Sequence, residues 1–117
     1  MLNNLIMDII ESVKICFKKY ATFSGRASIS EFWFFYLAYW IVTLITAVVF
    51  FPLMAIWSLA TLIPFYAVSA RRLHDIDKSG WFQLFYFIPL VGVIILIVWF
   101  ATKSDPGKNR YGPKPAK

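Results

Sequence analysis

The sequence predicts an all-α membrane protein with an N-terminal amphipathic helix, a transmembrane helical hairpin and a third hydrophobic segment. Three observations predict this class. Hydrophobic residues make up 60% of the 117 residues and charged residues only 15%, whereas soluble domains carry about 25% charged residues. No charged residue occurs between residues 32 and 70. The charges instead flank the long apolar runs, where membrane proteins carry their topology signals.

The charge balance and the cysteine content exclude other classes. A formal net charge of +6 would also suit a nucleic-acid-binding protein. All twelve Lys and Arg residues, however, lie before Glu31, between Arg71 and Lys78, or after Ala101, so we expect no nucleic-acid partner. Cys16 is the single cysteine and cannot form an intrachain disulfide. No Cys/His cluster has metal-ligand spacing, and we expect neither a metal nor a cofactor.

The first 20 residues have the pattern of an amphipathic helix. Apolar side chains recur at spacings of three and four between Leu2 and Tyr20, and Asp8, Lys18 and Lys19 fall on the opposite face. Such a helix can lie in the membrane interface with its apolar face toward the acyl chains. The alternative is a helix packed on the rest of the protein or on another subunit.

Residues 32–70 predict two antiparallel transmembrane helices. As one straight helix these 39 residues would reach about 58 Å, nearly twice the roughly 30 Å of a hydrocarbon core. We therefore predict spans at 32–50 and 53–70. Pro52 lies between them and suits the first turn of the second helix. At the start of the first span, a capping box is formed by Ser28 and Glu31.

Residues 81–101 form the third apolar segment and are long enough to cross once. Because Pro89 and Gly92 lie at the middle, both a kinked crossing and a re-entrant hairpin fit. Charge favours the re-entrant form, which keeps all twelve basic residues on one side, whereas three crossings place five of them outside. Shielding favours three crossings, because a re-entrant loop exposes backbone polar groups unless protein covers them.

Of these two forms we expect three crossings, and the tryptophans agree with that choice. Trp33 and Trp81 would then mark one membrane interface, with Trp57 and Trp99 near the other. Residues 102–117 are rich in Pro, Gly and charge and predict an extended basic tail in water.

A polar loop is predicted at residues 71–80. In an antiparallel hairpin, Glu31 at the start of the first span lies at the depth of Arg71 and Arg72 after the second, and it can pair with either. Asp75 lies four and three residues after these arginines, the spacing of ion pairs on one helix. We call this group the polar collar and expect it, with the N-terminus, on the cytoplasmic side. Its candidate residues are Arg26, Glu31, Arg71, Arg72, His74 and Asp75.

The polar collar has one structural and two functional interpretations. Structurally, it ends the second helix, fixes its depth and locks the hairpin. Alternatively, its arginines hold a lipid phosphate or an acidic partner, or His74 and Asp75 relay protons. We assign no catalytic residue, because the lone histidine has no serine or cysteine nucleophile in a recognisable setting.

These interpretations favour a non-enzymatic accessory or regulatory membrane protein that acts through lipid or protein contacts. Its expected partners are membrane lipids, a second copy of the chain or another membrane protein. The alternative is a small transporter or transporter subunit, which needs an aqueous path. Three spans provide such a path only by forming an oligomer.

Four ordered motifs resemble one family. They are Phe23-Ser-Gly-Arg-Ala-Ser-Ile-Ser-Glu-Phe-Trp, Ala70-Arg-Arg-Leu-His-Asp with Ser79-Gly-Trp, Ile88-Pro-Leu-Val-Gly, and Pro106-Gly-Lys-Asn-Arg-Tyr-Gly-Pro. Their order and spacing, over roughly residues 18 to 113, resemble the small bacterial inner-membrane proteins called domain of unknown function 805, the YhaH-like proteins. The resemblance implies a multi-pass inner-membrane location, and it carries over no activity, cofactor or catalytic residue.

Overall fold

The computed structural model of the chain describes residues 1–115 and folds them into helices without a strand. This confirms the all-α class. In chain order the helices are α1 (Leu2–Lys18), α2 (Ile29–Val49), α3 (Phe51–Asp75), the 3₁₀-helix η1 (Gly80–Phe87) and α4 (Val91–Phe100).

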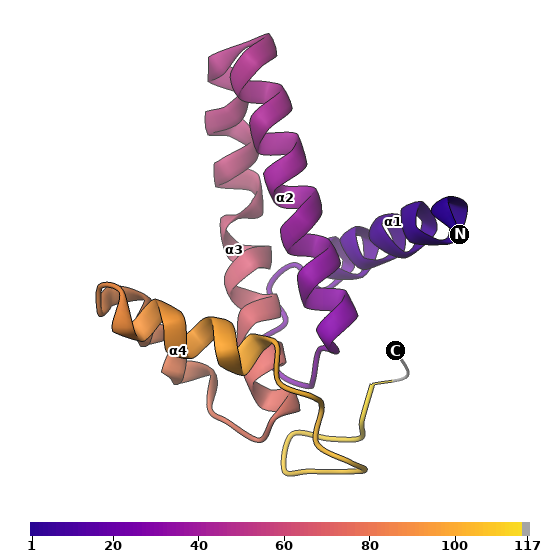
Figure 1. Cartoon of the computed structure of the whole chain (residues 1–117), viewed down its shortest axis with the longest axis vertical. Helices are drawn as coiled ribbons and strands as arrows, with labels where there is room; N and C mark the ends of the chain where they lie inside the picture. Colours follow the sequence, from indigo (N-terminus) through magenta and orange to yellow (C-terminus); the bar gives the residue numbers. More distant parts are fainter. Residues whose placement is uncertain (116–117) are drawn as a thin grey trace.

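α2 and α3 stand side by side as an antiparallel hairpin (Figure 1). Phe50 alone separates them, and its extended backbone, with φ of −162°, ends α2. Pro52 occupies the first turn of α3, where its missing N–H removes no helical hydrogen bond. The turn therefore forms at the position that the sequence predicts.

The hairpin has the dimensions and the surface of a membrane anchor. α2 has 21 residues and α3 has 25, which correspond to about 31 and 37 Å of helix. They are the helices within residues 1–115 that are long and apolar enough to cross a bilayer. Only 17% and 22% of their apolar windows are buried, so most of their apolar side chains face outward.

α3 extends beyond the span predicted for residues 53–70. It continues to Asp75, so the first half of the predicted polar loop, residues 71–80, is helical. The ion pair between Arg72 and Asp75, three residues apart, stabilises this last turn. Asp77 then takes a left-handed conformation with φ of 62° and ends the helical path.

α1 leaves the hairpin at a steep angle (Figure 1). Its C-terminal half packs against α2, where Cys16 is fully buried and the ring of Phe17 meets Phe35 edge-on with centroids 6.2 Å apart. Its N-terminal half is open, and Leu2 and Ile6 are 67% and 46% exposed. α1 therefore packs on the protein through its C-terminal half and exposes apolar side chains in its N-terminal half, and its place at a membrane interface stays a prediction.

The third apolar segment folds as a hairpin of two short helices, η1 and α4. Leu90, with φ of 63°, reverses the chain between them. Gly92 permits a close approach, because a Cβ there would lie 2.0 Å from the carbonyl oxygen of Phe85. α4 has 10 residues, about 15 Å of helix. The structure thus differs from the single kinked helix expected over 81–101, because the chain turns back at Leu90.

The third segment ends at the base of the α2–α3 hairpin, after projecting to the side opposite α1 (Figure 1). The indole of Trp33 donates to the carbonyl of Phe100 at 3.1 Å. The ammonium of Lys78 lies 4.7 Å from the ring centroid of Trp99. Trp99 therefore lies at the level of the polar loop and not near the opposite interface, where the three-crossing arrangement expects it.

The segment after α4 folds beneath the base of the hairpin (Figure 1). The backbones of Asn109 and Gly112 exchange two hydrogen bonds of 3.0 Å in an isolated bridge. The extended tail predicted over 102–117 is therefore folded at least as far as this bridge. Residues 116–117, the end of the predicted tail, lie outside the part of the chain that the structure describes.

Candidate functional site

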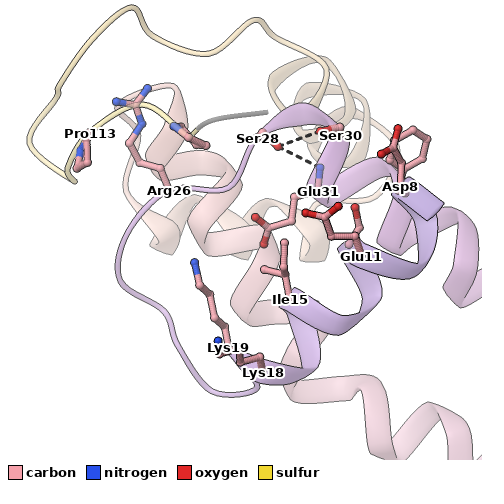
Figure 2. Close-up of a pocket in the computed structure, with 13 residues that line it drawn as sticks. Asp8, Glu11, Ile15, Lys18, Lys19, Arg26, Ser28, Ser30, Glu31 and Pro113 are labelled. Atoms are coloured by element: carbon pink, nitrogen blue, oxygen red, sulfur yellow. Dashed lines mark hydrogen bonds between the residues drawn. The ribbon is translucent and has the colours of Figure 1, made fainter. Parts of the chain in front are cut away.

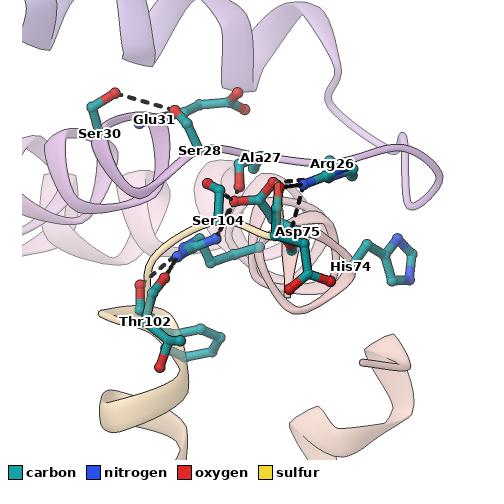
Figure 3. A network of polar contacts seen from close by, with 12 residues as sticks. Arg26, Ala27, Ser28, Ser30, Glu31, His74, Asp75, Thr102 and Ser104 are labelled. Carbon is teal, nitrogen blue, oxygen red and sulfur yellow. Dashed lines mark hydrogen bonds and ion pairs between the residues drawn. The ribbon is translucent and has the colours of Figure 1, made fainter. Parts of the chain in front are cut away.

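The structure brings all six predicted collar residues to the base of the α2–α3 hairpin. Figure 3 shows four of them, Arg26, Glu31, His74 and Asp75. Arg26 lies in the connection before α2, and Glu31 lies in the first turn of α2. The other four occupy the last turns of α3, which runs back to the level where α2 begins. The antiparallel hairpin thus places all six at similar depth, and five of them fall into two ion-pair groups.

The first group is centred on Arg26, whose guanidinium is saturated by bonds within the chain. Its Nε donates to Asp75 Oδ1 at 2.9 Å, and Nη2 donates to the carbonyl oxygens of Asp75 and Asp105 at 3.2 and 2.8 Å. Nη1 donates to the carbonyls of Gly107 and Gly112 at 2.7 and 3.1 Å. All five N–H donors of a guanidinium are occupied, so Arg26 has none left for an external phosphate.

Arg72 belongs to the same group and ties α3 to the end of α4. Its Nη1 donates to Asp75 Oδ2 at 2.6 Å and to the carbonyl of Ala27 at 3.3 Å. Its Nε donates to the carbonyl of Phe100 at 2.9 Å, and its Nη2 donates to that of Thr102. The exposed fraction of the Arg72 side chain is 0%, so these partners replace the water that the charge has lost.

Asp75 is the shared acceptor of this group. Its carboxylate accepts from Arg26, Arg72 and the hydroxyl of Ser104, and its side chain is fully buried. Its carbonyl accepts from the backbone N–H of Asp105 at 3.0 Å. One carboxylate therefore joins the connection before α2, the end of α3 and the segment after α4.

The second group is the buried pair of Glu31 and Arg71, in which Arg71 Nη1 bonds Glu31 Oε2. The sequence predicted a pair with either arginine, and the structure selects Arg71. Ser28 Oγ caps α2 by accepting from the N–H of Glu31 at 3.1 Å. The carboxylate of Glu31 does not return to the helix start, as the second half of a capping box would require, because it faces Arg71.

Cys16 lies against this pair, with its thiol Sγ 4.0 Å from Glu31 Oε2. Burial, and secondarily the Glu31 carboxylate, raises the pKa of the Cys16 thiol to about 12. Arg71 Nε and Nη2 have no hydrogen-bond partner among residues 1–115. The guanidinium of the second group therefore has fewer of its hydrogen-bond donors occupied than those of the first.

His74 docks the C-terminal segment. Its Nδ1 lies 2.9 Å from the carbonyl oxygen of Gly25, and since a carbonyl only accepts, Nδ1 carries the hydrogen. Its ring stacks on Tyr111, with centroids 3.9 Å apart and planes 2° from parallel. Asn109 Nδ2 donates to the His74 carbonyl at 3.0 Å. The imidazole thus packs between the connection before α2 and the C-terminal segment.

The C-terminal segment is the part of the site that the residue pattern did not predict. It supplies backbone carbonyls and the hydroxyl of Ser104 to the arginines and to Asp75. Backbone acceptors have no signature in a sequence. The only available signal was the motif from Pro106 to Pro113, which entered through the family resemblance.

Comparison with known proteins identifies a family and two inner-membrane relatives. The profile of the family described as "Protein of unknown function (DUF805)" matches residues 20–113. The inner membrane protein YhaI of Escherichia coli K12 is 41% identical over 105 residues, covering 84% of this chain and 89% of YhaI. The inner membrane protein YhaH of the same strain is 36% identical over 109 residues, covering 84% of this chain and 90% of YhaH.

No solved structure matches the chain significantly. The family match begins at residue 20, so it leaves out α1 and includes every residue of the polar collar. Because the family profile covers residues 20–113 and both relatives are more than 30% identical over most of their length, the chain belongs to the DUF805 family of proteins of unknown function.

Proposed function

We propose that the protein is a non-enzymatic accessory component of the bacterial inner membrane, anchored by the α2–α3 hairpin and acting through lipid or protein contacts around the polar collar. One observation carries this proposal: the charges of Arg26, Arg72 and Asp75 are buried and bonded within the chain. A catalytic or transport centre needs ionisable groups that reach a substrate or an ion pathway. These groups instead hold the fold together.

In this proposal only the α2–α3 hairpin crosses the bilayer, and α1 and the η1–α4 hairpin lie at one interface. Both elements project sideways from the base of the hairpin (Figure 1). Both expose apolar side chains, and Phe87 and Leu90 at the η1–α4 turn are 79% and 73% exposed. Acyl chains would cover these surfaces.

The charges support the same arrangement. Because η1–α4 begins and ends at the base of the hairpin, the Lys and Arg residues of the described chain all fall on one side of the anchor. The positive-inside bias places that side in the cytoplasm, together with the N-terminus. This removes the conflict in which five basic residues lay outside.

Reporter fusions test the arrangement. Green fluorescent protein and alkaline phosphatase are fused after Ser79 and after Pro113, with a fusion in the turn at Phe50 as the periplasmic control. We expect fluorescence and no phosphatase activity after Ser79 and Pro113, and the reverse at Phe50. Phosphatase activity after Pro113 would show that the third segment crosses the membrane.

A flux assay separates the accessory role from transport. The purified chain is reconstituted in liposomes that report proton and ion movement, beside empty liposomes. We expect no flux above that of empty liposomes. Flux that disappears in the His74→Ala or Asp75→Asn variant, while the variant still inserts, would overturn the accessory role. Cross-linking in native membranes then identifies a second copy of the chain or another membrane protein as the partner.

A further inference from the structure

A cavity of about 510 Å³ lies at the base of the hairpin, between the start of α2 and the C-terminal segment. α2 lines it with Ile29, Trp33 and Phe34, and the C-terminal segment lines it with Lys103 and Lys114. The proposed arrangement puts this base at the cytoplasmic interface. The cavity then lies at the level of the lipid headgroups.

The charge of this cavity is positive. Lys103 and Lys114 are its charged lining residues, and no carboxylate lines it within the part of the chain that the structure describes. A neighbouring cavity of about 800 Å³ differs, because acidic as well as basic side chains of α1 and α2 line it (Figure 2). Of the two, the cavity at Lys103 and Lys114 is therefore the one complementary to a ligand of net negative charge.

The ammonium groups of Lys103 and Lys114 are available to such a ligand. Both residues are exposed, and neither forms an ion pair within residues 1–115. The collar arginines differ, since all three are buried in ion pairs with the collar carboxylates. The arginines thus hold the fold together, and the lysines beside them keep their charge for a partner.

The polar collar holds the segment that carries these two lysines. The residue after the first lysine, Ser104, donates its hydroxyl hydrogen to the carboxylate of Asp75. Two residues before the second lysine, the carbonyl of Gly112 accepts from Arg26 Nη1 at 3.1 Å. The buried ion pairs therefore position both lysines beside one cavity, although they lie in separate parts of the segment.

The helix beyond the cavity is apolar. From Trp33 a stripe of side chains continues along α2 at spacings of four, three and four residues, and its members Leu37, Trp40 and Leu44 are exposed. Residues at these spacings lie on one face of a helix. An exposed apolar stripe therefore leads from the cavity along the membrane anchor, where acyl chains can lie against it.

We propose that this cavity binds the headgroup of an anionic phospholipid, with its phosphate at Lys103 and Lys114 and its acyl chains along the exposed stripe of α2. Lysines at the cytoplasmic surface attract anionic lipids. A zwitterionic headgroup also carries an ammonium, for which the described lining offers no carboxylate. The stripe favours a lipid over a soluble phosphate, because only a lipid brings acyl chains to cover it. The inference rests on the proposed function and names the class of lipid that the protein contacts.

Native mass spectrometry of the full chain in detergent tests the inference. The probes are short-chain phosphatidylglycerol, phosphatidylethanolamine and phosphatidylcholine, with deacylated glycerophosphoglycerol as a soluble competitor. We expect a one-to-one adduct with phosphatidylglycerol at several-fold lower concentration than with the two zwitterionic lipids. Equal binding of all three lipids would overturn the inference. Displacement of phosphatidylglycerol by an equal concentration of the competitor would overturn the assignment to a lipid.

Charge variants locate the adduct. Lys103→Gln and Lys114→Gln should each weaken phosphatidylglycerol binding about fivefold, the usual contribution of one lysine to binding an anionic membrane. Lys108→Gln is the matched control and should bind like the native chain, because Lys108 is exposed in the same segment but lies outside the cavity lining. Equal weakening by all three variants would show attraction by diffuse charge and would overturn the site.

The two proposals fail separately, because the adduct is measured in detergent and the arrangement in cells. Equal binding of the three lipids, with a cytoplasmic reporter after Pro113, overturns the headgroup site alone. A periplasmic reporter after Pro113 overturns the one-sided arrangement, whatever the lipid result.

Discussion

Arg26 and Asp75 form an ion pair, with Arg26 Nε 2.9 Å from Asp75 Oδ1, although 49 residues separate them. Their side chains are 1% and 0% exposed. Arg26 precedes α2 and Asp75 ends α3, so the pair closes the open end of the hairpin. At the other end of the hairpin, Phe50 connects α2 to α3 covalently. The hairpin is thus fastened at both ends, once covalently and once by charge.

Asp75→Asn should destabilise the fold strongly. The substitution leaves the buried guanidiniums of Arg26 and Arg72 without their carboxylate, and breaking a buried pair costs about 3–5 kcal/mol. The thermal unfolding midpoint in detergent and accumulation in the membrane report the loss. Asp77→Asn is the control, because Asp77 pairs with Arg110 at an exposed site, where such pairs contribute little. Equal losses in both variants would contradict the role of Asp75.

A charge exchange between Glu31 and Arg71 should preserve the fold better than either single reversal. Glu31→Arg places two buried positive charges together, so accumulation falls. Adding Arg71→Glu restores an ion pair and part of the accumulation. Adding Arg72→Glu should not rescue, because Arg72 pairs with Asp75. Rescue by Arg72→Glu but not by Arg71→Glu would contradict the observed pairing.

This pair shows how far the sequence predicted the site. The uncharged run and Pro52 were sufficient to predict an antiparallel hairpin. That hairpin places Glu31 at the depth of two arginines, Arg71 and Arg72. Which arginine pairs depends on how α3 is rotated about its axis. Neighbouring residues of a helix point about 100° apart, and that rotation is set by side-chain packing against α2, which the sequence pattern does not contain.

The third segment and the tail were less predictable. Pro89 and Gly92 allowed both a kinked helix and a hairpin, and the reversal occurs at Leu90, a residue type that rarely adopts a positive φ. The tail was expected in water because of its polar composition. It docks through backbone carbonyls that accept hydrogen bonds from Arg26. Because every residue has a backbone carbonyl, the sequence does not indicate which of them bind Arg26.

Arg26→Lys should release the C-terminal segment without unfolding the hairpin. An ammonium keeps the charge beside Asp75, but it has three donors on one nitrogen and cannot reach all the carbonyls that the guanidinium bonds. We expect faster tryptic cleavage after Lys108 in detergent, with α2 and α3 still resistant. Arg110→Lys, at the exposed pair with Asp77, is the control and should cleave like the native chain. Unchanged cleavage in Arg26→Lys would contradict its docking role.

Gly92→Ala should disrupt the η1–α4 hairpin. The new methyl would lie 2.0 Å from the Phe85 carbonyl oxygen, so the two helices must separate. Since the ring of Trp99 stacks on Phe85 with centroids 5.6 Å apart, separation should also change tryptophan emission. Val91→Ala alters an exposed neighbour and should leave emission and the thermal midpoint nearly unchanged. A native midpoint in Gly92→Ala would contradict the close approach.

Cys16 should resist thiol reagents until the protein unfolds. The thiolate is the nucleophile that attacks reagents such as maleimides, and burial, together with the Glu31 carboxylate, raises the pKa of the Cys16 thiol to about 12. Because a raised pKa keeps the thiol neutral, increasing the pH from about 7 to 9 adds almost no thiolate in the folded chain. The thiolate fraction of an ordinary thiol of pKa about 8.5 rises steeply over the same range.

The Lys14→Cys variant in a Cys16→Ser background is the exposed control and should label quickly, and faster as the pH rises. Denaturant should make the native chain label at the control's rate. Labelling of Cys16 at that rate in the folded protein would show that α1 detaches from the Glu31–Arg71 pair.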